Sequence, residues 1–223
     1  MSVQEYFVRD NARKAEIDEL LAEELKKAGY SRVELTKTPL GTRVVIYASK
    51  PGMVIGRRGQ SIRDLTQTLE EKFGIENPQI SVAAIEVPEL DAKVVASQVA
   101  MVLQRGVHFR RAAYGGVQRV MNAGALGVEI TIRGKLTTER ARYERYRSGY
   151  LPRVGEPVLN QLRRAVAFIQ LKPGLFGVNV KILPPDAEFP DRPIIKRETE
   201  PVPEISEEKK EEVPAEIAVN KEA

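Results

Sequence analysis

The amino-acid sequence predicts an α+β fold with two folded domains and a charged C-terminal tail. In residues 1–88, helical and strand-like patterns follow the order helix, strand, strand, helix, helix, strand. In residues 89–185 two helices come first and strands follow. Residues 186–223 are rich in Pro, Glu and Lys and show no apolar period. We therefore expect two domains, at 1–88 and 89–185, and a disordered acidic tail at 186–223.

The first domain is predicted from apolar spacing and from chain-breaking residues. A helix over 4–28 carries apolar residues at helical spacing, and Gly29 follows as a stop signal. Strands are expected at 31–37 and 42–49, because Val44, Ile46 and Ala48 alternate with their neighbours and a Pro–Gly turn joins the two. A short helical segment, a Gly-Arg-Arg-Gly sequence, a second helix ending at Gly74 and a strand at 79–87 complete the unit.

The second domain begins with helices predicted at 91–105 and 109–122. A strand follows in which Val128, Ile130 and Ile132 alternate with polar residues, the pattern of a half-buried strand. Residues 140–151 are expected to pair with it. A third strand is expected at 157–165, although 161–171 fits a helix equally well, and the last strand at 177–183. The expected architecture is two helices packed on one face of a mostly antiparallel sheet.

The composition excludes several functional classes. The chain has no cysteine and one histidine, His108, so disulfides, thiolate chemistry and multi-histidine metal sites are excluded. Neither a metal site, a cofactor nor a catalytic residue is expected, and a nuclease or lyase lacks support. No apolar run approaches the roughly 18–20 residues of a membrane span. The start of the chain carries Glu5 and Asp10 and has no apolar signal region, so we expect a cytoplasmic protein.

The charge is unevenly distributed along the chain. Residues 186–223 hold 12 acidic and 6 basic residues, a net charge of −6, whereas the remaining 185 residues hold 19 acidic and 29 basic residues, a net charge of +10. A basic body favours a polyanionic partner, because cations that neutralise phosphates release counterions. Net charge alone fits a solvated basic surface equally well, so the placement of the cations has to distinguish this alternative from a polyanion-binding surface.

The Gly56-Arg57-Arg58-Gly59 sequence is one of three GxxG matches, and it alone holds two arginines between two predicted helices. Glycines permit a tight turn with exposed backbone, and the helix that follows points its free N–H groups outward. Arg57 and Arg58 add planar donors suited to phosphate, and Gln60 can cap the helix or donate to a ligand. The alternative is a plain helix–turn–helix connection with solvated arginines.

A second basic cluster lies between residues 133 and 153, with tyrosines interleaved. Its basic members are Arg133, Lys135, Arg140, Arg142, Arg145, Arg147 and Arg153. Tyr143, Tyr146 and Tyr150 stand among them, and only two glutamates oppose the charge. Basic side chains suit contact with phosphates, and aromatic side chains suit stacking on nucleobases. A solvated strand is the alternative.

The segment VIGRRGQSI, residues 54–62, resembles the signature of a KH domain, and the element order resembles the type II arrangement. The similarity continues to about residue 185. The segments PELDAKVVASQV, FRRAAYGGVQRVM, GALGVEITIRGKL, ARYERYRSGYLP and LFGVNVKILPP follow in the order of the third small-subunit ribosomal protein family. Tyr114 and the two glycines after it resemble the archaeal and eukaryotic branch.

This resemblance implies a structural constituent of the small ribosomal subunit, with no homo-oligomer and no membrane association. It implies binding to rRNA in the head, a place at the mRNA entry channel, and contacts with the tenth and fourteenth small-subunit proteins in bacterial naming. Arg110 and Arg111 match arginines that face incoming mRNA. Tyr114 stands where the bacterial pattern has a third basic residue. A free-standing KH-type RNA-binding regulator is the alternative.

Overall fold

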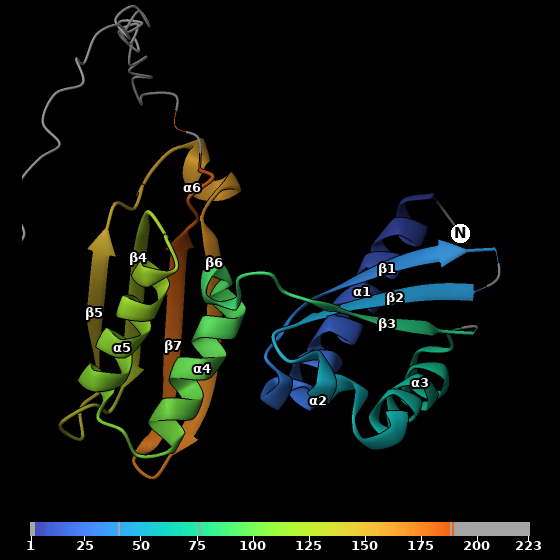
Figure 1. Ribbon diagram of the computed structural model, residues 1–223, viewed down its shortest axis with the longest axis horizontal. Helices are drawn as coiled ribbons and strands as arrows, with labels where there is room; N and C mark the ends of the chain where they lie inside the picture. The colour runs from blue at the N-terminus through green and yellow to red at the C-terminus, as the bar shows by residue number, and fades with distance from the viewer. Residues whose placement is uncertain (1–2, 40, 76, 188, 190–223) are drawn as a thin grey trace, which may run out of the picture. The chain divides into compact units, whose positions relative to one another are not determined.

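The computed structural model describes residues 3–39, 41–75, 77–187 and 189 (Figure 1). The acidic tail predicted at 186–223 lies outside the described residues, apart from 186, 187 and 189. The chain up to Phe189 forms one compact unit with two large, separate apolar cores.

The N-terminal core lies under a three-stranded sheet of order β1-β2-β3, in which β1 and β2 are antiparallel and β2 and β3 parallel. Its elements are α1 (Val3–Glu24), η1 (Lys26–Ala28), β1 (Tyr30–Thr38), β2 (Gly41–Ala48), α2 (Pro51–Ile55), η2 (Arg57–Gly59), α3 (Gln60–Phe73) and β3 (Gln79–Ala84). Gly29 ends the first helical segment with a φ of 72°, a left-handed conformation that glycine adopts without a steric penalty. The predicted order of elements is confirmed.

The N-terminal core joins all three helices to one face of β2. Val44, Ile46 and Ala48 are completely buried, as their alternation predicts. Ile17 and Leu21 of α1, Val54 of α2, and Leu65 and Leu69 of α3 pack against this face. The helices therefore leave the opposite face of the sheet uncovered.

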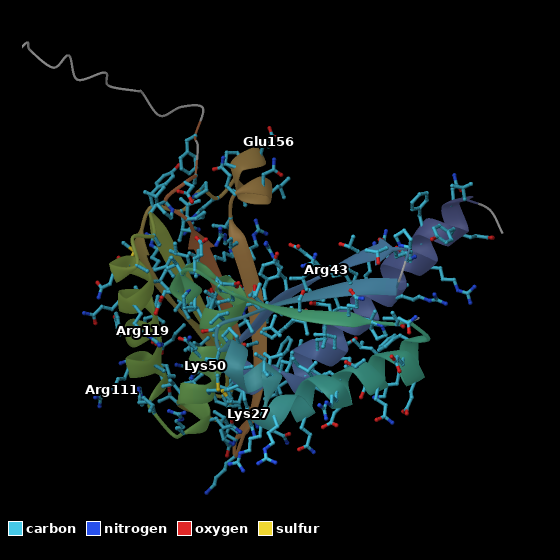
Figure 2. All side chains as sticks on the ribbon, turned by 45° about the vertical axis from the view of Figure 1, so that its right-hand side comes forward. Lys27, Arg43, Lys50, Arg111, Arg119 and Glu156 are labelled. Carbon is cyan, nitrogen blue, oxygen red and sulfur yellow. The ribbon has the colours of Figure 1, made fainter. Side chains whose placement is uncertain are left out.

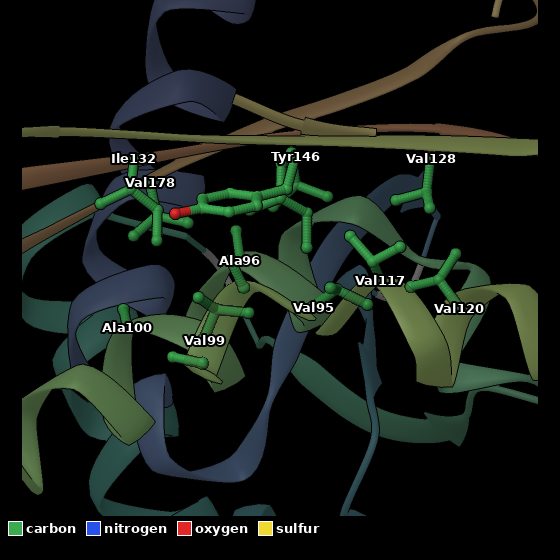
Figure 3. Close-up of a cluster of buried hydrophobic side chains, with 14 of the residues drawn as sticks. Val95, Ala96, Val99, Ala100, Val117, Val120, Val128, Ile132, Tyr146 and Val178 are labelled. Carbon is green, nitrogen blue, oxygen red and sulfur yellow. The ribbon is translucent and has the colours of Figure 1, made fainter. Parts of the chain in front are cut away.

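The C-terminal core is built on a four-stranded sheet of order β5-β4-β7-β6, in which every neighbouring pair is antiparallel. Its elements are η3 (Pro88–Leu90), α4 (Ala92–Gln104), α5 (Phe109–Asn122), β4 (Gly127–Gly134), β5 (Arg142–Gly149), α6 (Glu156–Asn160), β6 (Arg163–Leu171) and β7 (Gly174–Leu183). Helices α4 and α5 lie across one face of this sheet (Figure 1). Figure 3 shows the valines and alanines of both helices packed against Val128, Ile132 and the ring of Tyr146.

The strand predicted at 157–165 is partly wrong. Residues 156–160 form the short helix α6, and the strand begins only at Arg163. Pro157 occupies the first turn of α6, where its missing N–H costs no hydrogen bond. The predicted strand therefore starts about six residues before the observed one.

The prediction that β4 is half-buried is wrong, because this strand is buried on both faces. Glu129 and Thr131, which point away from the helices, are only 8% and 4% exposed. The reason is the central position of β4: its neighbours β5 and β7 carry long side chains over it. Arg145 and Lys181 both reach Glu129 Oε1, at 3.5 and 3.6 Å.

A polar cluster ties the start of α4 to the N-terminal elements. Asp91 caps α4 by accepting from the backbone N–H of Lys93 at 2.9 Å, and it also accepts from the Ser31 hydroxyl. Lys93 Nζ lies 3.2 Å from Asp18 Oδ2 and 4.4 Å from the centroid of the Tyr30 ring. Burial, followed by its hydrogen bond to Asp18, raises the pKa of Tyr30 above its ordinary value, so the hydroxyl stays a donor.

Candidate RNA-binding surfaces

The Gly56–Gly59 loop connects α2 to α3 through a single 3₁₀ turn, as the local sequence requires. Gly56 has a φ of 71°, and a Cβ there would lie 2.1 Å from Ser61 Oγ. Gly59 has a φ of 72° but open space around it. Arg58 also takes a left-handed conformation, with a φ of 54°. The two glycines therefore have different roles. Gly56 permits the close approach of the Ser61 side chain, whereas Gly59 only permits the turn.

The loop presents its cations to solvent, as predicted. Arg57, Arg58 and Gln60 are exposed. Helix α3 begins at Gln60 without a side-chain cap. The Gln60 N–H bonds the Arg57 carbonyl, and the N–H groups that follow it in the first turn stay available to a ligand. The prediction that Gln60 caps the helix is therefore not met, and its remaining role is that of an exposed donor. Among the described residues, neither arginine of the loop is hydrogen-bonded or ion-paired to the C-terminal cluster.

The start of α5 holds its two arginines in different environments. His108 caps the helix, its Nδ1 accepting from the Arg110 backbone N–H at 3.4 Å, and its ring lies 4.3 Å from that of Phe109. His108 therefore has a structural role at the start of this helix. Arg110 pairs with Glu144 of β5, Nε to Oε2, at 3.4 Å. The bond from the Tyr146 hydroxyl, together with Arg110, lowers the pKa of Glu144 below its ordinary value.

Arg111 is the freer of the two. It is exposed, and no described residue forms a hydrogen bond or ion pair with it. Figure 2 shows it along α5 with Arg119, which by contrast is fixed by a 2.9 Å hydrogen bond to Gln98 of α4. Tyr114 is 63% exposed, and its ring meets that of Tyr146 edge-on at 5.0 Å. Arg111 and Tyr114 thus remain open to a ligand.

The basic cluster at 133–153 is divided by strand alternation. Residues directly opposite each other in an antiparallel pair point to the same face. Ile130 opposes Tyr146, which is buried in the core, so both face the helices. Thr131 opposes Arg145 and Glu129 opposes Arg147, so these pairs point to the other side, as does Arg133. We call the side of the sheet away from α4 and α5 the outer face.

The other predicted members of the cluster do not join the outer face. Arg142 opposes Gly134 and takes the register of the helix side, although it is exposed. Lys135 and Arg140 are exposed in the connection between β4 and β5. Only Arg133, Arg145 and Arg147 are therefore brought together on one surface.

Two further cations complete the outer face. Lys181 of β7 lies opposite both Glu129 and Arg164 of β6, so one row across the sheet holds Arg147, Glu129, Lys181 and Arg164. Lys181 was missed as a site residue, although its strand was recognised. The alternation of Val178, Val180 and Ile182 with Asn179 and Lys181 is the signal that places it on this face.

The described part of the chain contains no group of three or more His, Cys, Asp or Glu side chains able to hold a metal ion. Within the same residues, no helix is both long and apolar enough to cross a membrane.

Comparisons with known proteins divide the chain at the same point as its two cores. The model of the KH domain matches residues 16–92, and that of the ribosomal protein S3 C-terminal domain matches residues 99–182. Small ribosomal subunit protein uS3 of Methanocaldococcus jannaschii is 50% identical over 206 residues, covering 92% of this chain and 99% of its own. The uS3 protein of Saccharolobus solfataricus is 50% identical over 184 residues, 82% of this chain and 80% of its own. The match to archaeal proteins agrees with the branch expected from Tyr114. With half of its residues identical over nearly the whole of such a relative, this chain belongs to the small ribosomal subunit protein uS3 family.

Proposed function

We propose that this protein is a non-catalytic, structural constituent of the small ribosomal subunit that binds rRNA in the head and borders the mRNA entry channel. The observation that carries this proposal is the union of a KH domain and an S3 C-terminal domain in one chain, each with an exposed group of arginines. As a part of the ribosome, the protein works in the cytoplasm.

The binding of rRNA is supported by the chemistry of the exposed cations. Arg57 and Arg58 stand beside the uncapped start of α3, where backbone N–H groups and guanidinium groups converge on one exposed loop. Such an arrangement suits a phosphate backbone, which carries charge but no sequence information. Lys135, Arg140 and Arg142 extend the exposed cationic surface of the C-terminal domain.

Sequencing of the RNA that crosslinks to the full-length protein in cells tests the main claim. Enrichment of small-subunit head rRNA, together with sedimentation of the protein with small subunits, is the expected result. Crosslinks dominated by assorted messages, from protein that sediments free of subunits, would instead identify a free-standing KH-type regulator.

The role at the mRNA entry channel rests on α5. Arg111 is exposed and unpaired among the described residues, whereas Arg110 is drawn towards Glu144. We expect Arg111→Ala to slow translation of structured messages more than Arg110→Ala does, with near-normal subunit assembly in both. Arg119→Ala on the same helix is the matched control. A severe assembly defect that is equal on all messages would mean that these arginines hold rRNA.

Contacts with the tenth and fourteenth small-subunit proteins belong to the same proposal. The exposed apolar side chains at the start of α1, Val3, Tyr6, Phe7 and Val8, offer one surface for such neighbours. Protein crosslinking within purified subunits, from a site on this helix, identifies which protein lies there.

A further inference from the structure

The outer face of the C-terminal sheet is an uncovered surface with an unusual distribution of charge. Its cations are Arg133, Arg145, Arg147, Arg164 and Lys181. Among the described strands the only carboxylate on this face is that of Glu129, which is 8% exposed and already shared by two of the cations. The face therefore presents a large surplus of positive charge.

The apolar side chains of this face lie at its margins. Tyr143 is on the edge strand β5 and is 65% exposed, and Phe168 is on the opposite edge strand β6 and is 61% exposed. Val166 of β6 lies beside Phe168, and Leu175 adds an exposed apolar side chain near the start of the central strand β7. The central strands carry the small or polar residues Thr131, Asn179 and Gly177 between them.

This distribution is the reverse of that in a protein–protein interface. There, a hydrophobic centre is surrounded by a polar rim, and charged residues are depleted from the centre. Here the two central strands carry Arg133, Glu129 and Lys181 among small or polar residues, so the centre is charged rather than hydrophobic. The exposed aromatic groups stand on the edge strands, beside the remaining cations Arg145, Arg147 and Arg164. A flat cationic floor with aromatic side chains suits a nucleic-acid strand, whose phosphates need cations and whose bases need surfaces to stack on.

The spacing of the side chains agrees with such a ligand. Residues two apart on one strand are separated by about 6.6 Å and adjacent strands by about 4.8 Å, so the face is about 14 Å across. One row holds Tyr143, Arg133, Gly177 and Phe168 in register. A Cβ on Gly177 would lie 3.8 Å from the Phe168 ring, so the ring leans over the glycine towards the centre. Arg145 and Arg147 follow Tyr143 along β5, at one and two further rows.

We propose that the outer face binds single-stranded RNA, with Tyr143 and Phe168 stacking on bases and Arg147, Arg164 and their cationic neighbours contacting phosphates. This inference rests on the RNA-binding function proposed above and adds a second site to it, separate from the Gly56–Gly59 loop and from α5. Arg145 and Lys181 have a further task on this face, because they neutralise the buried Glu129 carboxylate.

The test measures the affinity of the full-length protein for a labelled oligouridine of about 12 nucleotides, a length within the range that single-stranded sites cover. Tyr143→Ala and Phe168→Ala are each expected to weaken binding by about fivefold to a hundredfold with an unchanged salt slope, because stacking releases no counterions. Arg147→Gln is expected to reduce the slope of log affinity against log salt by about 0.7. Arg145 and Lys181 are left intact, so that Glu129 keeps its partners.

Matched controls come from the N-terminal helix and from α4. Phe7 is 61% exposed, like Phe168, and Arg105 is exposed at the end of α4, so Phe7→Ala and Arg105→Gln are expected to bind like the unaltered protein. Thermal unfolding confirms that each variant is folded. Equal affinity and equal salt slope for the outer-face variants and their controls would overturn the proposal.

Assembled subunits identify the source of the RNA. A photo-crosslinking phenylalanine analogue in place of Phe168 is expected to crosslink to RNA, and its sequence distinguishes rRNA from a message. Crosslinking to a neighbouring protein alone would overturn the proposal and assign the face to protein contact. If the unaltered protein failed to sediment with subunits, the proposed function itself would fall. Sedimentation with subunits combined with unaffected outer-face variants would remove only this site.

Discussion

The two sheets of this protein share one design but expose different surfaces. In each, helices cover a single face, and the other face is left without a helix. On the uncovered side of the N-terminal sheet, Arg32 is paired with Glu34 at 3.4 Å and lies over the Tyr47 ring at 4.5 Å, which leaves Arg43 as the one cation in excess among the described strand residues. On the outer face of the C-terminal sheet, five cations share one buried carboxylate. The N-terminal unit thus offers its cations on a loop, whereas the C-terminal unit offers them on a sheet.

The largest effect expected from this comparison concerns the two cores. Ile46 and Ile130 are both completely buried, each in a different core. Truncation of either side chain to alanine should reduce the free energy of unfolding by about 2–5 kcal/mol, through reduced burial and a residual cavity. In calorimetry, Ile46→Ala should lower one transition and Ile130→Ala another. A single transition lowered equally by both variants would show that the two sheets unfold as one unit.

The next largest effect concerns the loop of the N-terminal unit. Gly56→Ala forces alanine into a conformation, φ 71° and ψ −176°, that is essentially restricted to glycine, and its Cβ would lie 2.1 Å from Ser61 Oγ, so it should cost about 2–3 kcal/mol. Gly59→Ala meets only the conformational penalty, about 1 kcal/mol, because no atom lies within 4 Å of its Cβ. Urea unfolding of both variants measures the difference. Equal destabilisation would show that Ser61 moves aside without cost.

A third experiment compares the loop and the sheet as RNA-binding surfaces. Replacing Arg57 and Arg58 with Asp should flatten the slope of log RNA affinity against log salt by about 0.7–0.9 for each phosphate that the protein no longer neutralises. Aspartate tolerates the left-handed conformation of residue 58, so the fold should persist. The pair Arg133→Asp and Lys135→Asp gives the corresponding value for the C-terminal unit. An unchanged slope in the first pair would leave the C-terminal cations as the main RNA-binding groups.

The smallest effect is a pH dependence of the stability of the C-terminal unit. The pKa of Glu144 is held below its usual value of 4.5 by the Tyr146 hydroxyl and Arg110. A lowered folded-state pKa contributes stability that is complete above the unfolded-state value and is lost as pH falls through the folded-state value. Between about pH 5 and pH 3, Glu144→Gln should therefore lose less thermal stability than the unaltered protein. Parallel curves over this range would mean that the Arg110 and Tyr146 contacts do not persist in solution.

Local sequence signals were sufficient for the N-terminal unit. The Gly-Arg-Arg-Gly sequence lies within a few residues of every element that positions it, so breakers and helix periods predicted both the turn and the exposed arginines. Likewise α5 was predicted at its observed bounds, because its apolar spacing and the flanking residues are local. The KH resemblance rests on the same nine residues, 54–62.

The C-terminal site could be predicted only in part, because it depends on pairing between distant strands. The cluster between residues 133 and 153 is continuous in the sequence, but the register of β4 against β5 sends Arg133, Arg145 and Arg147 to one face and Arg142 to the other, while Lys135 and Arg140 lie between the strands. Lys181 joins Arg147 from more than 30 residues away through the β4–β7 pairing. The burial of Glu129 has the same origin, since the side chains that cover it belong to other strands.

The buried Glu129 carboxylate also restricts how the sheet can assemble. A slip of β4 by one residue against its neighbours would turn every side chain of the strand to the opposite face. Glu129 would then enter the apolar layer formed by Val99, Val117 and Val120, in which the described residues include no cation, while Ile130 would face the arginines. A hydrophobic residue at position 129 would remove that penalty and allow mispaired sheets to compete during folding. The carboxylate therefore fixes the register of β4 through two ion pairs, one with Arg145 of β5 and one with Lys181 of β7.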